Sequence, residues 1–442
     1  MSCGTGAAAD WAFSGIVPLT GRAGEPPLVP PGRAATYAWE LAELIHELTS
    51  RTRFPVRVDG AGLLSERAAF TGHGRRGRIS AGGACRLLPS ADGWAAVSCA
   101  RPDDPDLLGA LVGRVLPADP WPTVSAWLRD HSGAQLAERA ELLGIAAGPV
   151  APSKALDPDD PDPSLPPPPP RAPGAGSSPS LVPRPVDGLL VVDFSALWAG
   201  PLCAQLLGLA GARVVKVETP TRPDGARLGQ PDFYRLLHAG HRSVVLDPDT
   251  ASGRRALSAL VAAADIVIEA SRPRALARFG LDADAAVASG TTWISLTAAG
   301  RASGRVGFGD DVAAGAGLVA READGTPVFC GDAIADPLTG LTAAVRALTA
   351  PAHGGGFLHD IAMRDVVAAT LDGPRTPPPP VRRTDTSTGT STSTKTGTGW
   401  AVDTGERWIP VAAPRRREPV GQAPSTGADT VDVLRGLGIP RP

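Results

Sequence analysis

Short apolar runs alternate with helical segments through the middle of the chain. Five of these runs have the continuous apolar character of strands that are buried on both faces: 188–194 (GLLVVDF), 213–218 (RVVKVE), 243–246 (SVVL), 265–269 (DIVIE) and 292–296 (TWISL). Helical patterns at 202–209 and 256–264 lie between them. This alternation predicts a parallel, Rossmann-like α/β sheet with right-handed crossover connections.

The N-terminal part of the chain has a more mixed pattern. Helical periodicity is present at 34–48, 106–113 and 123–143, and strand-like runs are present at 86–88 and 94–99. The sequence DGW at 92–94 is suited to a turn between the two strands. This mixture predicts a smaller α+β module ahead of the sheet.

Two low-complexity stretches divide the chain. Residues 152–187 are Pro-rich and acidic, and residues 374–399 are rich in Thr and Ser without core-forming side chains. Such compositions bury too little apolar surface to form a packed core. We therefore expect an N-terminal module at 1–151, a Pro-rich linker at 152–187, a central module at 188–373, a second linker at 374–399 and a tail at 400–442.

Residues 8–48 and 309–348 resemble each other, which indicates a repeat. With a two-residue gap, matching residues fall together at five positions: Gly15 on Gly317, Pro27 on Pro327, Ala35 on Ala335, Leu41 on Leu341 and Leu48 on Leu348. In this register Asp336 of the later copy corresponds to Thr36 of the earlier one. A carboxylate in only one copy predicts a single working site.

Composition and charge exclude several classes of protein. The 442 residues carry a net charge of −2, which favours neither nucleic acid nor an anionic membrane as a partner. No apolar run approaches the ~20 residues that a membrane helix needs. The five cysteines are scattered without a CxxC pair, which points to the cytoplasm and against a metal site or disulfide framework.

Parallel sheets bind ligands beyond the carboxyl ends of their strands. The segments expected there are 196–201, Glu218, 271–278 and 297–304. The chain has no GxGxxG after its first predicted strand and no GxxxxGK[ST], so the usual dinucleotide and ATP phosphate loops are not expected. His238 and His241 are three residues apart but have no third metal ligand nearby in the sequence.

Five blocks in the central module carry a resemblance to a known family: LLVVDFSALWAGPLCAQLLGLAGARVVKVE (189–218), AGHRSVVLD (239–247), ADIVIEASRPRALARFGL (264–281), SLTAAGRASGRVGFGDD (295–311) and IADPLTGLTAAVRALTA (334–350). In this order they resemble the family III CoA-transferases, the CaiB/BaiF group. Residues 354–371 resemble the helix that follows in that family, residues 80–104 its large domain, and residues 421–439 its C-terminal end. The module order differs, because the large-domain segment precedes the central module.

The resemblance implies transfer of CoA from an acyl-CoA donor to a carboxylic acid, with no tightly bound cofactor. Asp336 matches the aspartate that attacks the donor thioester and then carries CoA as an aspartyl thioester. A carboxylate is a weak nucleophile and needs a desolvated site with pre-organised oxyanion donors. Gly82 and Gly83 match the glycine-rich loop over this site, where backbone N–H groups can approach closely.

The resemblance also implies contacts with CoA. Its matching positions are Leu197 after the first strand, Leu246 on the adenine side, and Arg278 and Phe279 at the phosphate; Arg272 and Asp310 are further candidates. Departures from the family pattern are Trp198, where a small or amide residue is usual, and Ala270, which replaces an Asn. Family members form interlocked dimers, so we expect the N-terminal module to cap the central site within one chain or in a homodimer.

Other interpretations of the same residues remain. From local sequence alone, Asp336 suits a helix N-cap, and Arg272 and Arg278 suit solvated surface positions. An acyl-CoA racemase of the same fold would need a catalytic His at position 310, where this chain has Asp310. A protein that binds CoA without catalysis is the third alternative.

Overall fold

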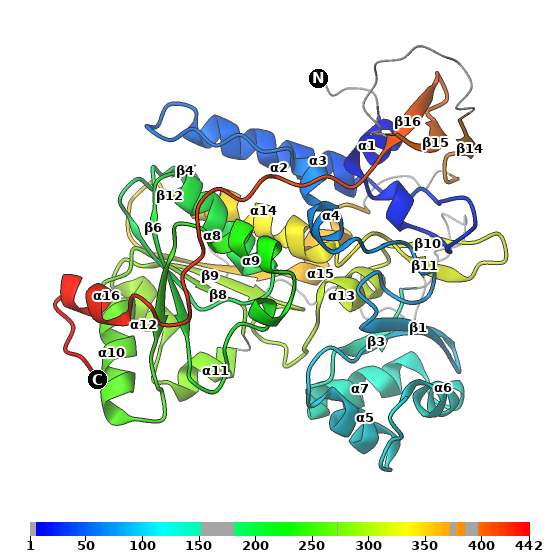
Figure 1. Ribbon diagram of the computed structural model, residues 1–442. Helices are drawn as coiled ribbons and strands as arrows, with labels where there is room; N and C mark the ends of the chain where they lie inside the picture. Colours follow the sequence, from blue (N-terminus) through cyan, green and yellow to red (C-terminus); the bar gives the residue numbers. More distant parts are fainter. Residues whose placement is uncertain (1–5, 152–180, 272, 372–376, 385–396) are drawn as a thin grey trace.

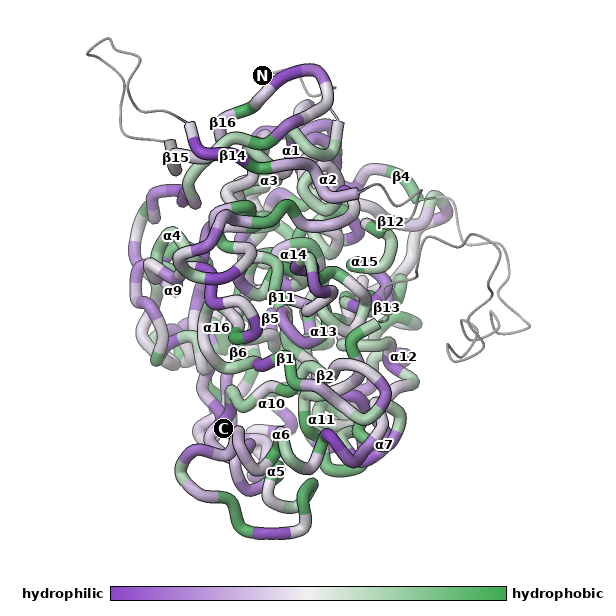
Figure 2. Tube along the Cα trace, turned by 90° about the vertical axis from the view of Figure 1, so that its right-hand side faces the viewer, coloured by the Kyte–Doolittle hydropathy of each residue, from purple (hydrophilic) through white to green (hydrophobic). Residues whose placement is uncertain are grey.

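The computed structural model describes residues 6–151, 181–271, 273–371, 377–384 and 397–442. Arg272 and residues 152–180 of the Pro-rich stretch lie outside these residues. The polypeptide forms a central α/β layer structure, a helical layer above it and a smaller α+β unit at the side (Figure 1). Apolar segments concentrate around α14 and β5 in the centre, whereas hydrophilic segments are more frequent in the outer loops (Figure 2).

The central sheet is parallel throughout, as predicted. Its strand order is β13-β9-β8-β5-β6-β7. The bounds are β5 Leu190–Asp193, β6 Arg213–Glu218, β7 Arg242–Val245, β8 Ile266–Glu269, β9 Thr292–Thr297 and β13 Phe357–Ala362. The five strands expected from sequence are confirmed, and the order reverses between β5 and β8, where such sheets bind ligands. Residues 354–371 do not form one helix, because β13 precedes α15 (Met363–Ala368).

Alternate residues along the buried strands point to two different cores, as the pleat requires. Val191, Ile268 and Ile294 face the core that contains α8 (Ala199–Leu209) and α14 (Ala335–Ala347). Val192 and Trp293 face the opposite core, which is covered by α10 (Ala251–Ala262), α12 (Ala283–Ala288) and α16 (Thr430–Gly436). Helices α9 (Pro231–His238) and α11 (Pro273–Arg278) complete the central layer.

The N-terminal part of the chain occupies two places. Helices α1 (Ala7–Ser14), α2 (Ala34–Thr49), α3 (Gly60–Leu63) and α4 (Glu66–Thr71) form the helical layer, and α2 packs on α14. The α+β unit contains β1 (Cys85–Ser90), β2 (Gly93–Ser98), α5 (Asp104–Val112), α6 (Trp121–Arg129), α7 (Gly133–Leu143) and β3 (Ala147–Pro149). This unit lies apart from the helical layer (Figure 1) and has its own apolar core. The antiparallel β1–β2 pair confirms the predicted hairpin with its turn at 92–94.

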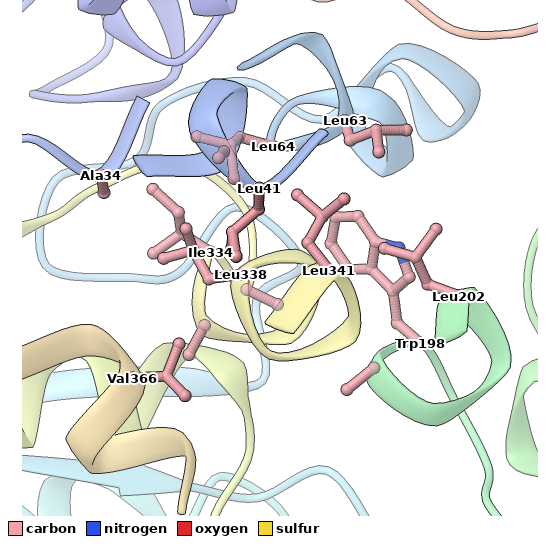
Figure 3. Close-up of a cluster of buried hydrophobic side chains, with 14 of the residues drawn as sticks. Ala34, Leu41, Leu63, Leu64, Trp198, Leu202, Ile334, Leu338, Leu341 and Val366 are labelled. Atoms are coloured by element: carbon pink, nitrogen blue, oxygen red, sulfur yellow. The ribbon is translucent and has the colours of Figure 1, made fainter. Parts of the chain in front are cut away.

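The helix bounds agree with the register of the repeat. When Gly15 is aligned with Gly317, helix α1 falls on helix α13 (Gly309–Gly315). After the two-residue gap, α2 begins within one residue of the position that matches the start of α14. The matching residues Leu41 and Leu341 enter one apolar cluster, together with Leu338 and Leu202 (Figure 3). The two copies are therefore packed against each other through corresponding faces.

The segments after residue 376 differ from the expected linker and tail. Strands β14 (Val381–Arg383), β15 (Gly397–Asp403) and β16 (Trp408–Ala412) form an antiparallel sheet beside α1. The guanidinium groups of Arg382 and Arg383 lie 4.1 Å and 5.3 Å from the ring centroids of Trp408 and Trp400. These contacts let a stretch with little apolar content pair as a strand. Smaller strand pairs are β10 (Val319–Arg321) with β11 (Pro327–Phe329) and β4 (Leu181–Pro183) with β12 (Thr349–Pro351).

Candidate active site

Asp336 lies in the first turn of α14 without acting as its cap. The N-cap position is Ile334, and no side-chain cap bond is present there. The backbone N–H of Asp336 donates to the carbonyl of Ala333 at 3.0 Å. Within the described part of the chain, the Asp336 carboxylate accepts no hydrogen bond. The local interpretation as a helix cap is therefore wrong, and this carboxylate is available for other contacts.

Two backbone positions next to Asp336 are unusual: Gly309, which leaves room for the carboxylate, and Ala333, which has a left-handed conformation. A Cβ added to Gly309 would lie 2.2 Å from Asp336 Oδ2 and 2.5 Å from the Ala333 carbonyl oxygen. Ala333 itself has a φ of 50°, a left-handed conformation that costs a non-glycine residue free energy. Strain of this kind is often held at functional sites.

Three further carboxylates surround the start of α14. Asp310 accepts a hydrogen bond from the Ala333 N–H at 2.8 Å. Asp311 accepts hydrogen bonds from the Ser98 hydroxyl at 3.0 Å and the Phe308 N–H at 2.9 Å. Asp332 is fully buried. Ser98 comes from the α+β unit, so this unit contributes directly to the surroundings of the site.

The carboxylates have different proton affinities because their partners differ. Burial, followed by the charge of nearby aspartates, raises the pKa of Asp336 to about 7 against the opposing effect of Arg67. Burial also raises the pKa of both Asp310 and Asp311 to about 6. For Asp332 burial is again the largest single influence and acts in the same direction, but the charges and hydrogen bonds of Arg67 and His73 together outweigh it and hold the pKa below its usual range.

Arg67 of α4 joins the N-terminal helices to this carboxylate cluster. Its Nε donates to Asp332 Oδ2 at 2.9 Å, and its Nη2 donates to the other carboxylate oxygen. The ring of His73 is also close, with Nδ1 at 3.5 Å from Asp332 Oδ2. The Arg67 guanidinium lies 5.5 Å from the ring centroid of Trp198. The arginine therefore neutralises Asp332 and leaves Asp336 without a direct cationic partner.

The glycine-rich loop reaches the same ion pair. A Cβ added to Gly82 would lie 3.6 Å from Arg67 Nη2 and 3.8 Å from Asp332 Oδ1. Gly83 has a φ of 86°, and its N–H donates to the Ser80 carbonyl at 2.8 Å. Gly83 is thus required by the turn, whereas Gly82 places exposed backbone beside the Arg67–Asp332 pair.

The residues expected to contact CoA are spread along the carboxyl edge of the sheet. Leu197 follows β5 with a φ of 69°, and its N–H donates to Asp224 Oδ1 at 3.0 Å. Leu246 is buried in the core on the opposite face of the sheet from α14, and Phe279 packs against that core. Arg278 ends α11 and is exposed. Asp310 lies in the carboxylate cluster, and Arg272 lies outside the described residues.

Trp198 belongs to the core. It is 2% exposed and meets Phe233 edge to face at a centroid distance of 5.4 Å. Figure 3 shows its ring beside Leu202 and Leu341. Its indole is therefore part of the apolar core that contains α8 and α14.

Sequence reasoning missed Arg67, Asp332 and a buried lysine. Lys216 in β6 donates from Nζ to the Ser195 carbonyl at 2.5 Å and lies 3.0 Å from Asp224 Oδ2. It thereby ties the loop after β5, next to Leu197, to the loop after β6. A signal was present in RVVKVE, where a charged residue interrupts a strand that is otherwise apolar. Arg67 and Asp332 gave no such signal, because they are 265 residues apart.

The described residues offer neither a metal site nor a membrane-spanning helix. Across the described ranges, no group of three or more His, Cys, Asp or Glu side chains has the arrangement of a metal site. His238 and His241 are both buried in the core beside α9. None of the described helices is long and apolar enough to cross a membrane.

Comparison with known proteins places the central module in one family. The model of CoA-transferase family III matches residues 186–417. The succinate–glutarate CoA-transferase of Agrobacterium fabrum is 31% identical over 211 residues, covering 42% of this chain and 53% of that protein. The succinyl-CoA–D-citramalate CoA-transferase of Chloroflexus aurantiacus is 30% identical over 208 residues, covering 43% and 52%.

A solved structure of a CAIB/BAIF family protein from Brucella suis is 29% identical, with a TM-score of 0.39 over 43% of this chain and 56% of that one. The chain spans about half the length of the curated relatives that it matches. The family match extends over more than half of this chain and includes the sheet, α14 and all four clustered aspartates. The chain therefore belongs to CoA-transferase family III.

Proposed function

We propose that this chain transfers CoA from an acyl-CoA donor to a free carboxylic acid, with Asp336 as the nucleophile. The observation that carries the proposal is the contrast between two aspartates four residues apart. Asp332 is buried and paired with Arg67, while Asp336 is partly exposed and its carboxylate has no hydrogen bond in the described residues. Only the second can reach a substrate carbonyl.

The proposed reaction conserves both acyl groups. An Asp336 carboxylate oxygen attacks the thioester carbonyl, the C–S bond breaks, and CoA thiolate leaves behind a mixed anhydride. The thiolate then attacks the aspartyl carbonyl, which releases the donor acid and forms an aspartyl-CoA thioester. The acceptor carboxylate enters by the reverse sequence, so that the acceptor leaves as its CoA thioester and Asp336 is restored.

The surroundings of Asp336 suit this role. A pKa raised to about 7 gives the ionised carboxylate more basicity than an ordinary aspartate, and basicity increases nucleophilicity. Ionised Asp336 remains within the field of Arg67, which limits the rise in pKa and keeps a fraction of the group anionic at neutral pH. Arg67 acts here as a positioning residue through Asp332.

The N-terminal module completes the proposed site within one chain. Gly82 lies beside the Arg67–Asp332 pair, so its exposed backbone can approach an oxyanion formed on a bound thioester. The adenosine end of CoA is proposed to follow the sheet edge from Leu197 toward Leu246, Arg278 and Phe279, on the family resemblance. Because Leu246 and Phe279 belong to the opposite core from α14, CoA must cross the carboxyl edge to reach Asp336.

The names of the matched relatives suggest the first substrates to test. Their names specify succinate, glutarate, succinyl-CoA and D-citramalate. All of these are small polar acids or their thioesters. We propose acids of this class as donors and acceptors for this chain.

The test is trapping of the covalent intermediate. The full chain is incubated with a mixture of these acyl-CoA esters, digested and analysed by mass spectrometry for a CoA thioester, with hydroxylamine cleavage as the check on the bond. We expect the adduct on Asp336 and its loss in Asp336→Asn. Asp324→Asn, at an exposed carboxyl in the turn between β10 and β11, serves as the charge-matched control.

Two results contradict the proposal. Normal CoA exchange by Asp336→Asn would remove Asp336 as the nucleophile. Incorporation of deuterium at the α-carbon of an acyl-CoA, without exchange of CoA, would instead assign the chain to racemase chemistry.

A further inference from the structure

A groove of about 520 Å³ lies on the N-terminal module, between the stretch 76–79, β1 and the helix α6. This volume is in the range of small-molecule sites. Five arginines line it, drawn from four separate segments of the chain: Arg22, Arg76, Arg78, Arg86 and Arg129. The lining residues precede position 186, where the match to the family model begins.

The charges in this groove are not balanced. Arg22 is paired with Glu322. In the part of the chain that the structure describes, the other four arginines have no carboxylate within 4 Å. One carboxylate lines the groove, that of Asp119, and it accepts a hydrogen bond from the Trp121 N–H at 3.3 Å. A local excess of positive charge therefore exists on a chain whose net charge is −2.

Two of the arginines lie over aromatic rings. The Arg86 guanidinium lies 4.5 Å from the ring centroid of Trp121, and that of Arg78 lies 5.7 Å from the centroid of Trp94. A cation–π contact uses the face of the guanidinium, while its N–H groups point outward in the plane. Pre-oriented N–H forks of this kind match pairs of phosphate oxygens.

Arg86 also carries an unsatisfied donor. Its Nε is shielded from solvent and has no hydrogen-bond acceptor among the described residues. Buried donors are ordinarily paired, and one left unpaired costs free energy. An anion bound in the groove would supply acceptors to Arg86.

We propose that this groove is a binding site for a small phosphorylated ligand that presents a diphosphate group. Two arginines on aromatic supports and two exposed arginines can together offer bidentate contacts to two phosphates. The groove adjoins the glycine loop, because a Cβ added to Gly83 would lie 2.9 Å from Arg76 Nη1. A ligand bound to Arg76 would therefore lie close to the glycine loop. Binding in the groove does not depend on the CoA-transfer proposal.

Calorimetry on the full chain tests the proposal, with inorganic pyrophosphate as the probe in 150 mM salt, at which surface charges are largely screened beyond roughly 8 Å. The groove variant carries Arg78→Gln with Arg129→Gln, both at exposed positions in different walls. The control carries Arg51→Gln with Arg255→Gln, which are exposed arginines without an ion pair in the described chain. We expect the groove variant to weaken binding at least tenfold and the control to leave it within twofold.

Two further probes identify the source of the diphosphate. Tighter binding of ADP than of CoA points to a nucleotide, and the reverse order points to a second CoA, provided that the groove variant weakens the same probe. Thermal unfolding of both variants verifies that the fold is retained.

The proposal is overturned if the wild-type chain does not bind pyrophosphate, or if the groove variant binds it as tightly as the wild type. Equal losses in both double variants would mean that only net charge matters. Citrate binding as tight as that of pyrophosphate would show general anion attraction and remove the assignment to phosphate.

Discussion

The two copies of the repeat share their helices but differ where chemistry is possible. In the later copy Asp336 sits at the start of α14 without a hydrogen bond in the described chain, and its pKa is raised by burial. In the earlier copy the hydroxyl of Thr36 donates to Asp10 Oδ2 at 2.6 Å. The later copy therefore keeps a polar group available, whereas the earlier copy uses the same position for an internal contact.

The difference extends to the space around that position. Gly309 leaves room for the Asp336 carboxylate, and in the register of the repeat the residue that matches Gly309 is Ala7. Position 7, directly before the earlier copy, therefore carries a Cβ where the later copy has none. Helix α2 nevertheless packs on α14, so the earlier copy supports the helix that presents Asp336.

The largest expected effect comes from giving the later copy the residue of the earlier one. Gly309→Ala places a Cβ 2.2 Å from Asp336 Oδ2 and 2.5 Å from a backbone oxygen, so both must move. Displacing a reacting group by an ångström can cost orders of magnitude in rate. We expect CoA exchange to fall about 10³-fold, which is roughly 4 kcal/mol, as measured by label transfer from acyl-CoA to free acid.

Gly315→Ala is the control for this substitution, because it lies on the same helix. A Cβ there would meet its nearest atoms at 3.5 Å, an ordinary contact. We expect this variant to retain activity. If Gly309→Ala kept full activity, the space beside Asp336 would not be what separates the two copies.

The next effect concerns the ion pair between Arg67 and Asp332, which has no counterpart in the earlier copy. In Arg67→Ala the fully buried Asp332 loses its charged partner, and breaking a pair from one side leaves a buried charge uncompensated. We expect the free energy of unfolding to fall by about 3 kcal/mol, measured by urea denaturation at pH 7. The double variant Arg67→Ala with Asp332→Asn should recover much of this loss. Additive losses in the double variant would contradict a coupled pair.

The fold could be predicted where short-range pattern decides it. The strands of the sheet are apolar on both faces, so their runs are visible in sequence, and their alternation with helices determines the parallel order. β13 was missed because His359 and Asp360 break its apolar run. β14 was missed because its stabilisation comes from arginines stacked on tryptophans of two other strands.

The candidate site was only partly accessible to sequence reasoning. Asp336 came from a family resemblance, because GDAIAD contains two acids and nothing local separates their roles. Their difference arises when Arg67, from a distant segment, pairs with Asp332. Contacts of this range follow from how the layers pack, and that packing is not encoded in any short stretch of residues.

The proton affinity of Asp336 predicts a pH-dependent effect on stability. Its pKa is about 7 in the folded protein against an ordinary value of 3.8, so the folded state binds the proton more tightly. The resulting stability is complete below pH 4 and is lost as the pH rises through 7. Asp336→Asn cannot ionise and avoids this loss. We expect it to be about 2 kcal/mol more stable than the wild type at pH 8 and nearly equal at pH 4.

Urea denaturation at the two pH values measures this difference. A variant that is destabilised equally at both pH values would show that Asp336 serves the stability of the fold, as Thr36 does. The activity of the wild type should rise with pH through an apparent pKa near 7, because the nucleophile must be ionised.

The smallest effect is expected at Thr36, the residue of the earlier copy that matches Asp336. Its substitution should lower the stability of the fold, whereas Asp336→Asn should raise it. Thr36→Val keeps the shape of the side chain but removes the hydrogen bond that Asp10, 8% exposed, receives from the hydroxyl. Loss of one such bond costs about 1 kcal/mol, and CoA exchange should be unchanged because no reacting group has moved. Substitution at one position of the repeat would then stabilise the protein and abolish transfer, while substitution at its counterpart would weaken the fold and spare transfer. If Thr36→Val also reduced exchange more than tenfold, the earlier copy would have to contribute to the reaction itself, and the division of labour between the copies would be wrong.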